Sequence, residues 1–298
     1  MASVQDIKRR LRSVRNTGKI TKAMELVAGA RLRRAEARIT AMRPYAERMR
    51  ELMIGTARAA GSMTRLPLLE VRDNPQSVAI LVLTGDRGLA GPFNAQVLRR
   101  AFALEAEYRK SGLSVRWLVV GKKGRSTLAF RRYVIDQEWT GFTDRPEYHH
   151  ASEIGHRIVD LFTSREVDRV VMVFNHYISP LTQEVESLEL LPVPRSALES
   201  EEEKTPQEIA LEGDIIYEPD PEQILARLLP AYIETSIFRS LLESTASEHG
   251  ARMTAMRNAS QNASELIESL TLDMNRARQA AITQELLEVV AGADALTQ

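Results

Sequence analysis

From Asp220 to the C-terminus, the hydrophobic and polar positions follow the pattern of one long helix. Asp220 is suited to cap a helix, Pro221 fits the first turn, and Gln223 is placed to bond back to the cap. No proline follows Pro230. A helix of about 75 residues would be about 110 Å long, whereas helices of globular domains are much shorter. Recurring Glu, Asp and Arg exclude a membrane span, so the pattern favours a coiled coil.

Within this segment, small and apolar residues recur in steps of three and four. A mean spacing of about 3.5 residues is typical of left-handed supercoiled helices. Ala and Met predominate over Leu, which lets a partner helix approach closely. The alternative is packing against a globular core, which is less favoured because a domain of this size has no core of such length. The positions are Ala246, His249, Met253, Met256, Ser260, Ala263, Ile267, Leu270, Met274, Ala277 and Ala281.

Residues 3–59 form a second predicted long helix, with Ser3 placed to cap it. An apolar stripe runs along it, with a phase shift near Gly18, and Pro44 predicts a bend or a one-turn irregularity. Because this stripe is as narrow as the one near the C-terminus, we expect the two terminal helices to wrap around each other in antiparallel directions. The stripe consists of Val4, Ile7, Leu11 and Val14, followed by Ile20, Met24 and Val27.

Between the two predicted helices the period of the pattern changes. Apolar runs, partly β-branched, predict strands, and helical patterns lie between them. The predicted strands are 77–84, 115–120, 169–174 and 182–191, and the predicted helices are 94–110, 123–131 and 147–164. Strands that alternate with helices predict a parallel, wound α/β sheet. The charged segment 199–207 is predicted to be a solvated, mobile loop.

The expected fold class is therefore α/β. A Rossmann-like wound sheet domain at 60–219 is inserted between two terminal helices, 1–59 and 220–298, that form an antiparallel left-handed coiled coil.

The chain has no net charge, but its charge is unevenly distributed. Residues 1–59 hold 15 Lys and Arg against 5 Asp and Glu, residues 60–219 hold 19 against 24, and residues 220–298 hold 6 against 11. A basic first helix and an acidic last helix favour pairing with each other, and the surplus on the first invites an acidic partner. The absence of cysteine excludes disulfides, thiol catalysis and Cys-ligated metals, and it fits a reducing compartment.

Two glycine-containing turns are the best candidates for binding phosphate. Gly85–Gly91 (GDRGLAG) follows the first predicted strand and opens a helix, where wound sheets bind phosphate groups. Its spacing is not that of the dinucleotide fingerprint, and Pro92 lacks an amide donor. Gly121–Ser126 (GKKGRS) lacks the P-loop spacing. Both segments therefore favour tight turns over nucleotide sites.

No other set of residues has the pattern of an active site. The chain contains neither an H-E-x-x-H motif, nor a G-x-S-x-G motif, nor a carboxylate pair that stands out as a dyad. We therefore expect no catalytic residue, no metal and no cofactor. The histidines, expected to be surface or packed residues, are His149, His150, His156, His176 and His249.

The basic first helix leaves a second interpretation open, a coiled-coil adaptor or nucleic-acid-binding protein with a wound α/β domain. Aromatic residues make up only 5% of the chain, so its arginines are expected to pair with the last helix or with a protein partner. No apolar run predicts a membrane span. The Arg-rich start of the chain is also similar to a mitochondrial transit peptide, but the helical pattern continues past a cleavable length.

Four stretches, in chain order, resemble the gamma subunit of F-type ATP synthases. Lys19–Ala28 (KITKAMELVA) is similar to that family's KITKAMEMVA, and Ala277–Leu286 (ARQAAITQEL) is similar to its ARQASITQEL. Thr84–Asn94 (TGDRGLAGPFN) resembles TSDRGLCGGLN, and Tyr217–Asp220 matches YEPD. The resemblance covers the whole chain.

The turn within Thr84–Asn94 departs from the family pattern at three positions. Gly85 replaces Ser, Ala90 replaces Cys and Pro92 replaces Gly, which removes a hydroxyl group and adds rigidity. The cysteine insertion of the chloroplast forms is absent, so thiol regulation is not expected and a bacterial type is favoured.

The resemblance implies a non-catalytic central rotor shaft that transmits torque and couples proton flow to ATP synthesis. Its coiled coil would lie within a ring of three alpha and three beta subunits, one shaft per ring. Its α/β domain would lie outside, against the epsilon subunit and the ring of membrane c subunits. Such a chain binds no cofactor and no nucleic acid, and it is peripheral on the cytoplasmic face of the cell membrane.

The resemblance also implies contacts with the beta subunits. Arg278 and Gln279 would catch on beta-subunit loops, Met24 would face the acidic lever loop, and Arg252 would hold the same region in register. The alternative, an exposed helix-surface ion pair worth about 0.2–1 kcal/mol, weighs more for Arg252 and Glu285 than for Arg278 and Gln279. The expected contact residues are Met24, Arg252, Arg278, Gln279, Thr283 and Glu285.

Overall fold

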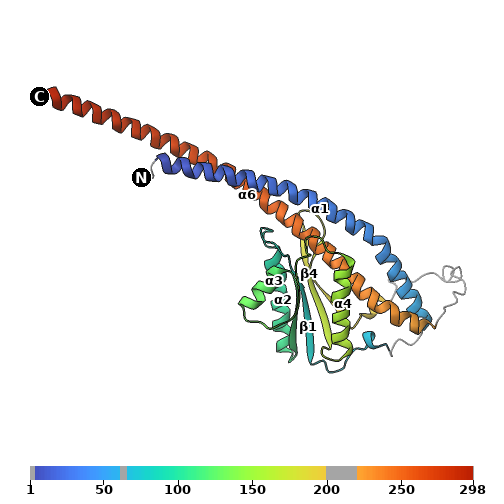
Figure 1. The fold of residues 1–298 in the computed structure, drawn as a ribbon. Helices are drawn as coiled ribbons and strands as arrows, with labels where there is room; N and C mark the ends of the chain where they lie inside the picture. Colours follow the sequence, from blue (N-terminus) through green and yellow to red (C-terminus); the bar gives the residue numbers. More distant parts are fainter. Residues whose placement is uncertain (1–3, 61–65, 199–219, 298) are drawn as a thin grey trace. The chain divides into compact units, whose positions relative to one another are not determined.

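The computed structural model describes residues 4–60, 66–198 and 220–297 (Figure 1). Contacts divide the chain into two compact units: unit 1 is Met1–Gly29 with Arg252–Gln298, and unit 2 is Ala30–Ala251. The elements are α1 (Val4–Ala60), η1 (Pro67–Leu69), β1 (Ser77–Leu83), α2 (Phe93–Lys110), β2 (Ser114–Val120), α3 (Lys122–Phe130), β3 (Ile135–Trp139), α4 (Tyr148–Thr163), β4 (Arg169–Tyr177), β5 (Gln183–Leu191), η2 (Arg195–Ala197) and α6 (Pro221–Thr297).

Unit 2 contains a five-stranded sheet in the order β3-β2-β1-β4-β5. Strands β1 to β4 pair in parallel, whereas β5 is antiparallel to β4. The four predicted strands and the three predicted helices between them are confirmed, with ends that agree within three residues. The predicted parallel, wound sheet is confirmed for β1 to β4, whereas β5 is added in the antiparallel direction. The prediction missed β3, because the sequence IDQEW is short and polar and forms a half-buried edge strand.

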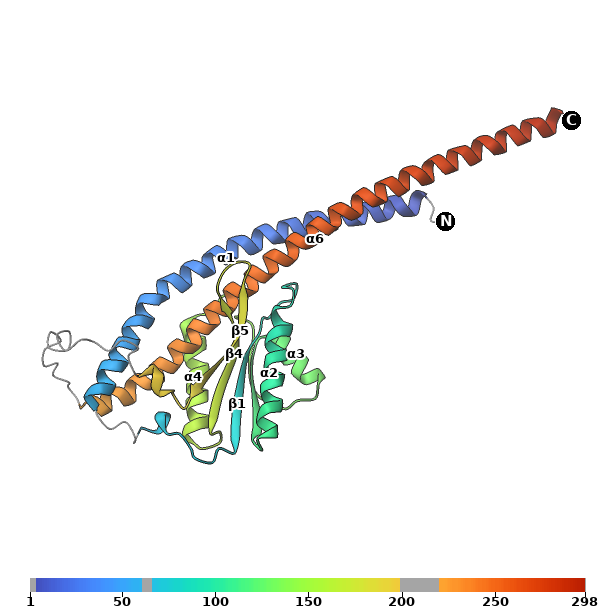
Figure 2. The same cartoon turned by 180° about the vertical axis from the view of Figure 1, so that it is seen from behind.

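Both faces of the sheet are covered, which explains the continuous apolar run of β1. Ala79, Leu81 and Leu83 join a core shared with α4 and α6, and Val78, Ile80 and Val82 join a second core shared with α2 and α3. Figures 1 and 2 show α2 and α3 on one face and α4 on the other. Because neither face meets water, alternation of apolar with polar residues is not required.

The first part of α6 packs into the core of unit 2. Leu225, Leu229, Ile233, Ile237 and Leu241 recur every four residues and are at most 3% exposed. Packing against a globular core, the less favoured interpretation, is therefore correct for this stretch. The same core receives the last turns of α1, whose contributing residues are Met49, Met53 and Ala57.

The two long helices are continuous over the predicted ranges. α1 spans 57 residues with Pro44 inside it, and α6 spans 77 residues with Pro230 inside it. Pro44 therefore does not end the helix, and the bend or one-turn irregularity predicted there stays a prediction. The predicted cap at Ser3, the charged segment 199–207 and most of the YEPD stretch lie outside the described residues.

Unit 1 brings the start of α1 and the second half of α6 into contact in opposite directions. Thr21 and Ser260 share a hydrogen bond between their hydroxyl oxygens at 2.8 Å, and Arg257 donates to Glu25 at 3.2 Å. A methyl group built on Gly18 would lie 3.4 Å from the Cβ of Ala263. As the residue number rises along α1, the number of its partner on α6 falls.

The contact face of α1 keeps one register, and the predicted phase shift near Gly18 is wrong. The stripe consists of Val4, Ile7, Leu11, Val14, Gly18, Thr21, Glu25 and Ala28, all buried or half-buried. Small and polar residues occupy its second half, so an apolar pattern could not reveal it. Ile20 and Val27, assigned to the stripe from the sequence, are 60% and 53% exposed. On α6, the predicted positions are buried or half-buried as far as Ala277, whereas Ala281 is exposed.

A carboxylate ties the amino-terminal ends of β1 and β4 together. Asp168 accepts hydrogen bonds from Arg72 at 2.6 Å and from the backbone amides of Gln76 and Ser77 at 2.7 and 2.9 Å. Arg72 also donates to the carbonyls of Val167 and Phe162. Burial alone would raise the pKa of Asp168, but these hydrogen bonds outweigh it and lower the pKa to about 2.

We expect Asp168→Asn to reduce the free energy of unfolding by about 1–2 kcal/mol at neutral pH. Because the folded pKa of Asp168 lies below its ordinary value of 3.8, its contribution is complete above about pH 5. That contribution is lost as the pH falls towards 2. Urea unfolding of both proteins at several pH values measures the difference. Asp73→Asn, at an exposed carboxylate of the same segment, is the control, and a pH-independent gap between wild type and Asp168→Asn would contradict the account.

The contact at Gly18 predicts a sharp dependence on side-chain size. Gly18→Ala places a methyl group in ordinary contact with Ala263 and should stabilise the helix by about 0.5–1 kcal/mol. Gly18→Leu cannot be accommodated at that distance and should lower the melting temperature followed by circular dichroism. Equal melting temperatures for the two variants would show that the helices do not approach closely at Gly18.

Candidate functional site

The last described turns of α6 form an exposed surface with both polar and apolar groups. All side chains from Arg278 to Val290 are exposed. Four predicted contact residues lie here, and the Thr283 hydroxyl donates to the Gln279 carbonyl at 3.0 Å. The apolar members, each about half exposed or more, are Ile282, Leu286, Leu287, Val289 and Val290. An exposed apolar surface of this kind is characteristic of a protein interface.

A second exposed stripe lies on α1 beside its contact face. We call Ile20, Met24 and Val27 the outer stripe. Met24 is half-buried, and the residues one turn on either side of it, Ile20 and Val27, are exposed. The outer stripe therefore presents apolar groups outward, and it belongs to the KITKAMELVA stretch. The sequence found these residues but assigned them to the wrong face of the helix.

Arg252 differs from the other predicted contact residues. Its side chain is buried, with 8% of the residue exposed, and a buried charge in a protein requires polar partners. The chain itself covers most of Arg252, whereas Arg278, Gln279, Thr283 and Glu285 are open. The structure thus gathers four of the six predicted residues on one stretch of helix and places Met24 and Arg252 elsewhere in unit 1.

The ion pair within the contact face of unit 1 has the opposite polarity to the one expected. The sequence predicted basic groups on α1 and acidic groups on α6, but Glu25 of α1 is paired with Arg257 of α6 and also with Lys22 at 2.9 Å. The hydrogen bonds from Lys22 and Arg257 lower the pKa of Glu25 below its ordinary value. Several basic side chains of α1 therefore remain at its surface: Arg9, Arg12, Arg15 and Lys19 are exposed.

At the carboxyl edge of the sheet, where wound folds bind phosphate groups, the Asp86 side chain is bonded to backbone amides of its own chain. Asp86 accepts hydrogen bonds from the amides of Lys122, Gly141 and Thr143 at 3.0, 2.8 and 3.2 Å. Burial alone would raise the pKa of Asp86, but these bonds and the Thr143 hydroxyl lower it. The amino-terminal amide of α3 is thus already used, which agrees with the interpretation of both glycine segments as structural turns.

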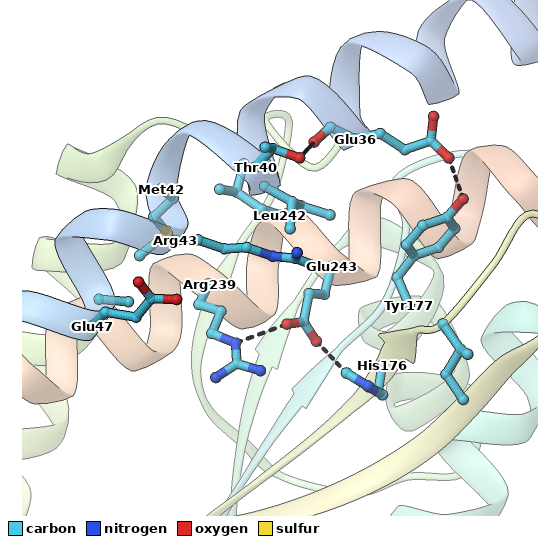
Figure 3. Close-up of a pocket in the computed structure, with 13 residues that line it drawn as sticks. Glu36, Thr40, Met42, Arg43, Glu47, His176, Tyr177, Arg239, Leu242 and Glu243 are labelled. Atoms are coloured by element: carbon cyan, nitrogen blue, oxygen red, sulfur yellow. Dashed lines mark hydrogen bonds and ion pairs between the residues drawn. The ribbon is translucent and has the colours of Figure 1, made fainter. Parts of the chain in front are cut away.

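A groove of about 580 Å³ in unit 2 is lined by α1, α6 and the end of β4 (Figure 3). In it, Glu243 accepts from Arg239 at 2.8 Å and lies 2.6 Å from Nδ1 of His176. The Tyr177 hydroxyl donates to Glu36. Burial and the nearby Glu36 raise the pKa of Tyr177. The polar groups of this groove are mostly paired with one another, so they hold elements together and do not form a reaction centre.

His150 and His249 also have structural surroundings, whereas His149 and His156 are exposed. His150 stacks on Phe142 and accepts from the amide of Glu147, and His249 is buried 3.6 Å from Asp144. Over residues 4–60, 66–198 and 220–297, no three His, Asp or Glu side chains come together as a metal site. In the same ranges, no helix combines the length and the apolar character needed to cross a bilayer.

Comparison with known proteins identifies the family. Residues 3–296 match a family model described as ATP synthase. The ATP synthase gamma chain of Rubrobacter xylanophilus is 44% identical over 296 residues, covering 99% of both chains. That of Halothermothrix orenii is 43% identical over 99% of this chain and all of its own. The chain belongs to the ATP synthase gamma chain family.

Solved structures agree with this assignment. A chain of the central stalk and c ring of the Tetrahymena thermophila mitochondrial ATP synthase is 25% identical. Its TM-score is 0.58, covering 81% of this chain and 99% of that one. A chain of the Euglena gracilis mitochondrial ATP synthase has a TM-score of 0.68 at 16% identity, covering 98% and 94%, and it supports the fold alone.

A gamma chain is the rotor subunit of the central stalk of ATP synthase and is not itself catalytic. This agrees with the polar groups of unit 2, whose hydrogen bonds serve to join elements. Neither the family match nor the structural matches support the alternative of an adaptor or nucleic-acid-binding protein.

Sequence reasoning missed two features of this gamma chain. The first is Asp86, because a carboxylate that bonds to the start of α3 and to the loop after β3 cannot be recognised before these segments are placed. The second is a set of buried polar residues on α6 between Ser240 and His249. In the sequence these residues are a run of polar residues within a predicted helix. Such a run looks the same as an ordinary solvent-facing stretch, and only the structure shows that it is buried.

Proposed function

We propose that this gamma chain is a torsionally stiff shaft that turns inside a ring of three alpha and three beta subunits. One observation carries the proposal. Every described side chain from Arg278 to Val290 is exposed on an uninterrupted helix, and five of them are large and apolar. Such a surface requires a surrounding protein, and the ring provides one for a member of this family.

The helices of unit 1 form an antiparallel, left-handed coiled coil. Support comes from the steps of three and four on both helices and from the contacts between Thr21 and Ser260 and between Glu25 and Arg257. Two helices joined along a seam resist twisting better than one. The gamma chain functions as three segments, with a shaft made of 1–59 and 220–298 and an inserted α/β domain at 60–219.

The α/β domain lies outside the ring, against the epsilon subunit and the membrane ring of c subunits. The chain is then a peripheral component on the cytoplasmic face of the cell membrane. Proton flow turns the c ring, the α/β domain turns with it, and α6 carries the rotation into the ring. The Tetrahymena chain, described as central stalk and c ring, supports this arrangement.

The exposed end of α6 and the outer stripe of α1 meet the beta subunits. Arg278 and Gln279 catch on beta-subunit loops through directional hydrogen bonds, with Thr283 and Glu285 on the same stretch of helix. Met24 meets the acidic lever loop, whose charge suits the exposed basic groups around it. Arg252 acts from within the chain by holding this region in register. The open apolar groups of both surfaces allow sliding between these contacts.

We expect Met24→Lys to impair coupling more than assembly. A lysine places a positive charge in the outer stripe. Its attraction to the acidic lever loop would persist through most of a rotation and oppose the turning of the shaft. ATP synthesis in vesicles should fall several-fold relative to ATP hydrolysis by the same complexes, and gel filtration should show normal assembly. Met24→Leu, which conserves volume, is the control. A Met24→Lys complex that couples normally would contradict this role of the outer stripe.

Removal of the catch residues should have a different effect. Arg278→Ala combined with Gln279→Ala removes hydrogen bonds that form only at certain rotor angles. We expect lower rates of both synthesis and hydrolysis, by about thirtyfold if two bonds are lost and each is worth about 1 kcal/mol. Steady-state rates of purified complexes provide the measurement. Gln261→Ala, at an exposed position earlier on α6, is the control. Unchanged rates in the double variant would remove Arg278 and Gln279 from the interface.

A further inference from the structure

One stretch of α6 in unit 2 is buried although it is polar. The apolar stretch of α6 that precedes it ends at Leu241 and Leu242. The polar residues that follow are also buried, at 5% exposure or less. We call these residues the polar belt: Glu243, Ser244, Thr245, Ser247, Glu248 and His249. Buried polar groups are costly unless they find partners, so the belt requires partners in the rest of unit 2.

Those partners lie at the carboxyl edge of the sheet. The Thr245 hydroxyl is shared between two carbonyls, that of Thr143 in the loop after β3 at 2.9 Å and that of Leu241 in its own helix at 2.8 Å. The Ser247 hydroxyl donates to the carbonyl of Asn175, near the end of β4, at 3.2 Å. At the start of the belt, Glu243 meets His176 of the same strand (Figure 3).

Two further contacts complete this arrangement. A methyl group built on Gly85, in the turn after β1, would lie 2.7 Å from the carboxyl carbon of Glu248, so the Glu248 carboxyl group packs directly against the Gly85 backbone. Asp144, next to Thr143, lies 3.6 Å from His249 and is also paired with Arg31 of α1. The loops after β1 and β3 and the end of β4 thus all contact fewer than two turns of α6.

The loops that contact the belt are themselves held in place. Asp86 bonds to the amide and hydroxyl of Thr143 and to the amide of Gly141, and the Asp86 amide in turn donates to the Thr143 hydroxyl. Asp86 therefore fixes the loop whose carbonyl receives Thr245. Because the contact points are preorganised, displacement of the helix would break several hydrogen bonds together.

The character of the contacts changes along α6. Leu225 to Leu241 contribute apolar contacts, which are non-directional and tolerate small rotations. Hydrogen bonds depend steeply on distance and angle, and buried polar groups can specify one register among several of similar packing energy. The belt is therefore the part of α6 in unit 2 where directional contacts oppose rotation of the helix about its own axis.

We infer that the polar belt is the joint that locks α6 to the α/β domain. In this joint, the edge at which wound sheets bind ligands instead holds the shaft helix of the same chain. Thr245, Ser247 and His249 are positioning residues for torque transfer, together with Thr143 and Asp144 of the loop. This inference rests on the proposed shaft function, because it specifies where torque enters the shaft.

A disulfide across the joint tests whether it is rigid. The chain has no cysteine, so Thr143→Cys with Thr245→Cys introduces the chain's only two thiols at residues already in contact. The double variant is assembled into the complete ATP synthase, in which the cysteines of the other subunits have been replaced. Disulfide formation is followed by gel mobility, and ATP synthesis is measured before and after reduction.

A locked joint predicts that synthesis is the same in the oxidised and reduced states, because the disulfide restrains a contact that does not move. Loss of synthesis on oxidation, with recovery on reduction, would overturn the inference, since it would show that α6 must move against the domain. Each single-cysteine variant controls for the effects of substitution and oxidant.

Loosening the joint is the complementary experiment. Thr245→Val with Ser247→Ala removes both hydroxyl donors while nearly conserving volume. A probe is attached to a single cysteine at the exposed position Phe130 in the α/β domain, and the ring of the complete complex is immobilised. The angular fluctuations of the probe in a stalled complex then give the torsional stiffness. The matched control is Thr163→Val, whose hydroxyl bonds only within α4.

We expect the belt variant to lose torsional stiffness and ATP synthesis under load, while unloaded ATP hydrolysis and assembly are retained and the control is unchanged. Stiffness equal to that of the wild type would overturn the inference. Failure of the proposed function has a different signature, because the wild-type chain would then neither join the ring nor alter its turnover.

Discussion

Helix α6 has to stay continuous from Pro221 to Thr297, and this constraint determines what its residues can be. Over its length the helix contributes leucine and isoleucine to a globular core, polar groups to the edge of a sheet, small residues to a second helix, and an exposed surface at its end. A break in the helix between any two of these stretches would prevent the transmission of torque from one stretch to the next. Glycine inside the helix is confined to Gly250 and Gly292, which agrees with a requirement for stiffness.

The part of the unit 1 contact face around Gly18, Thr21 and Glu25 uses small and polar side chains where a stable coiled coil would use leucine. Gly18, Thr21 and Glu25 approach Ala263, Ser260 and Arg257 closely. Such a seam is thin, which suits a shaft that has to fit inside a ring. Apolar side chains that would otherwise fill the seam lie outward instead, at Ile20 and Val27.

Much of the fold follows from the sequence, because its signals are local. Continuous apolar runs marked β1, β2 and β4, and the starts of α2, α3 and α4 lie within one residue of the predicted positions. The polar strand β3 was not predicted, because an edge strand needs few apolar residues and so lacks the apolar run that marks a buried strand. The face of α1 was assigned wrongly because apolar periodicity cannot distinguish a seam built from Gly, Thr and Glu from the exposed stripe beside it.

The site residues, like the elements of the fold, differ in whether a local sequence signal marks them. The terminal motifs pointed to Met24 and to Arg278 and Gln279 through resemblance, and no physical signal in the pattern would have selected them. The polar belt and Asp86 depend on loops that are distant in sequence but meet at one edge of the sheet. Their roles become visible only when the sheet order and the path of α6 are known.

The most direct test of the shaft account is reconstitution with alpha and beta subunits from a related gamma-chain-containing synthase. ATP hydrolysis is assayed with and without this chain, and the copy number is determined from the purified complex. The account predicts one copy per three alpha–beta pairs and a higher turnover when the chain is present. A chain that neither associates with the ring nor changes its turnover would contradict the account.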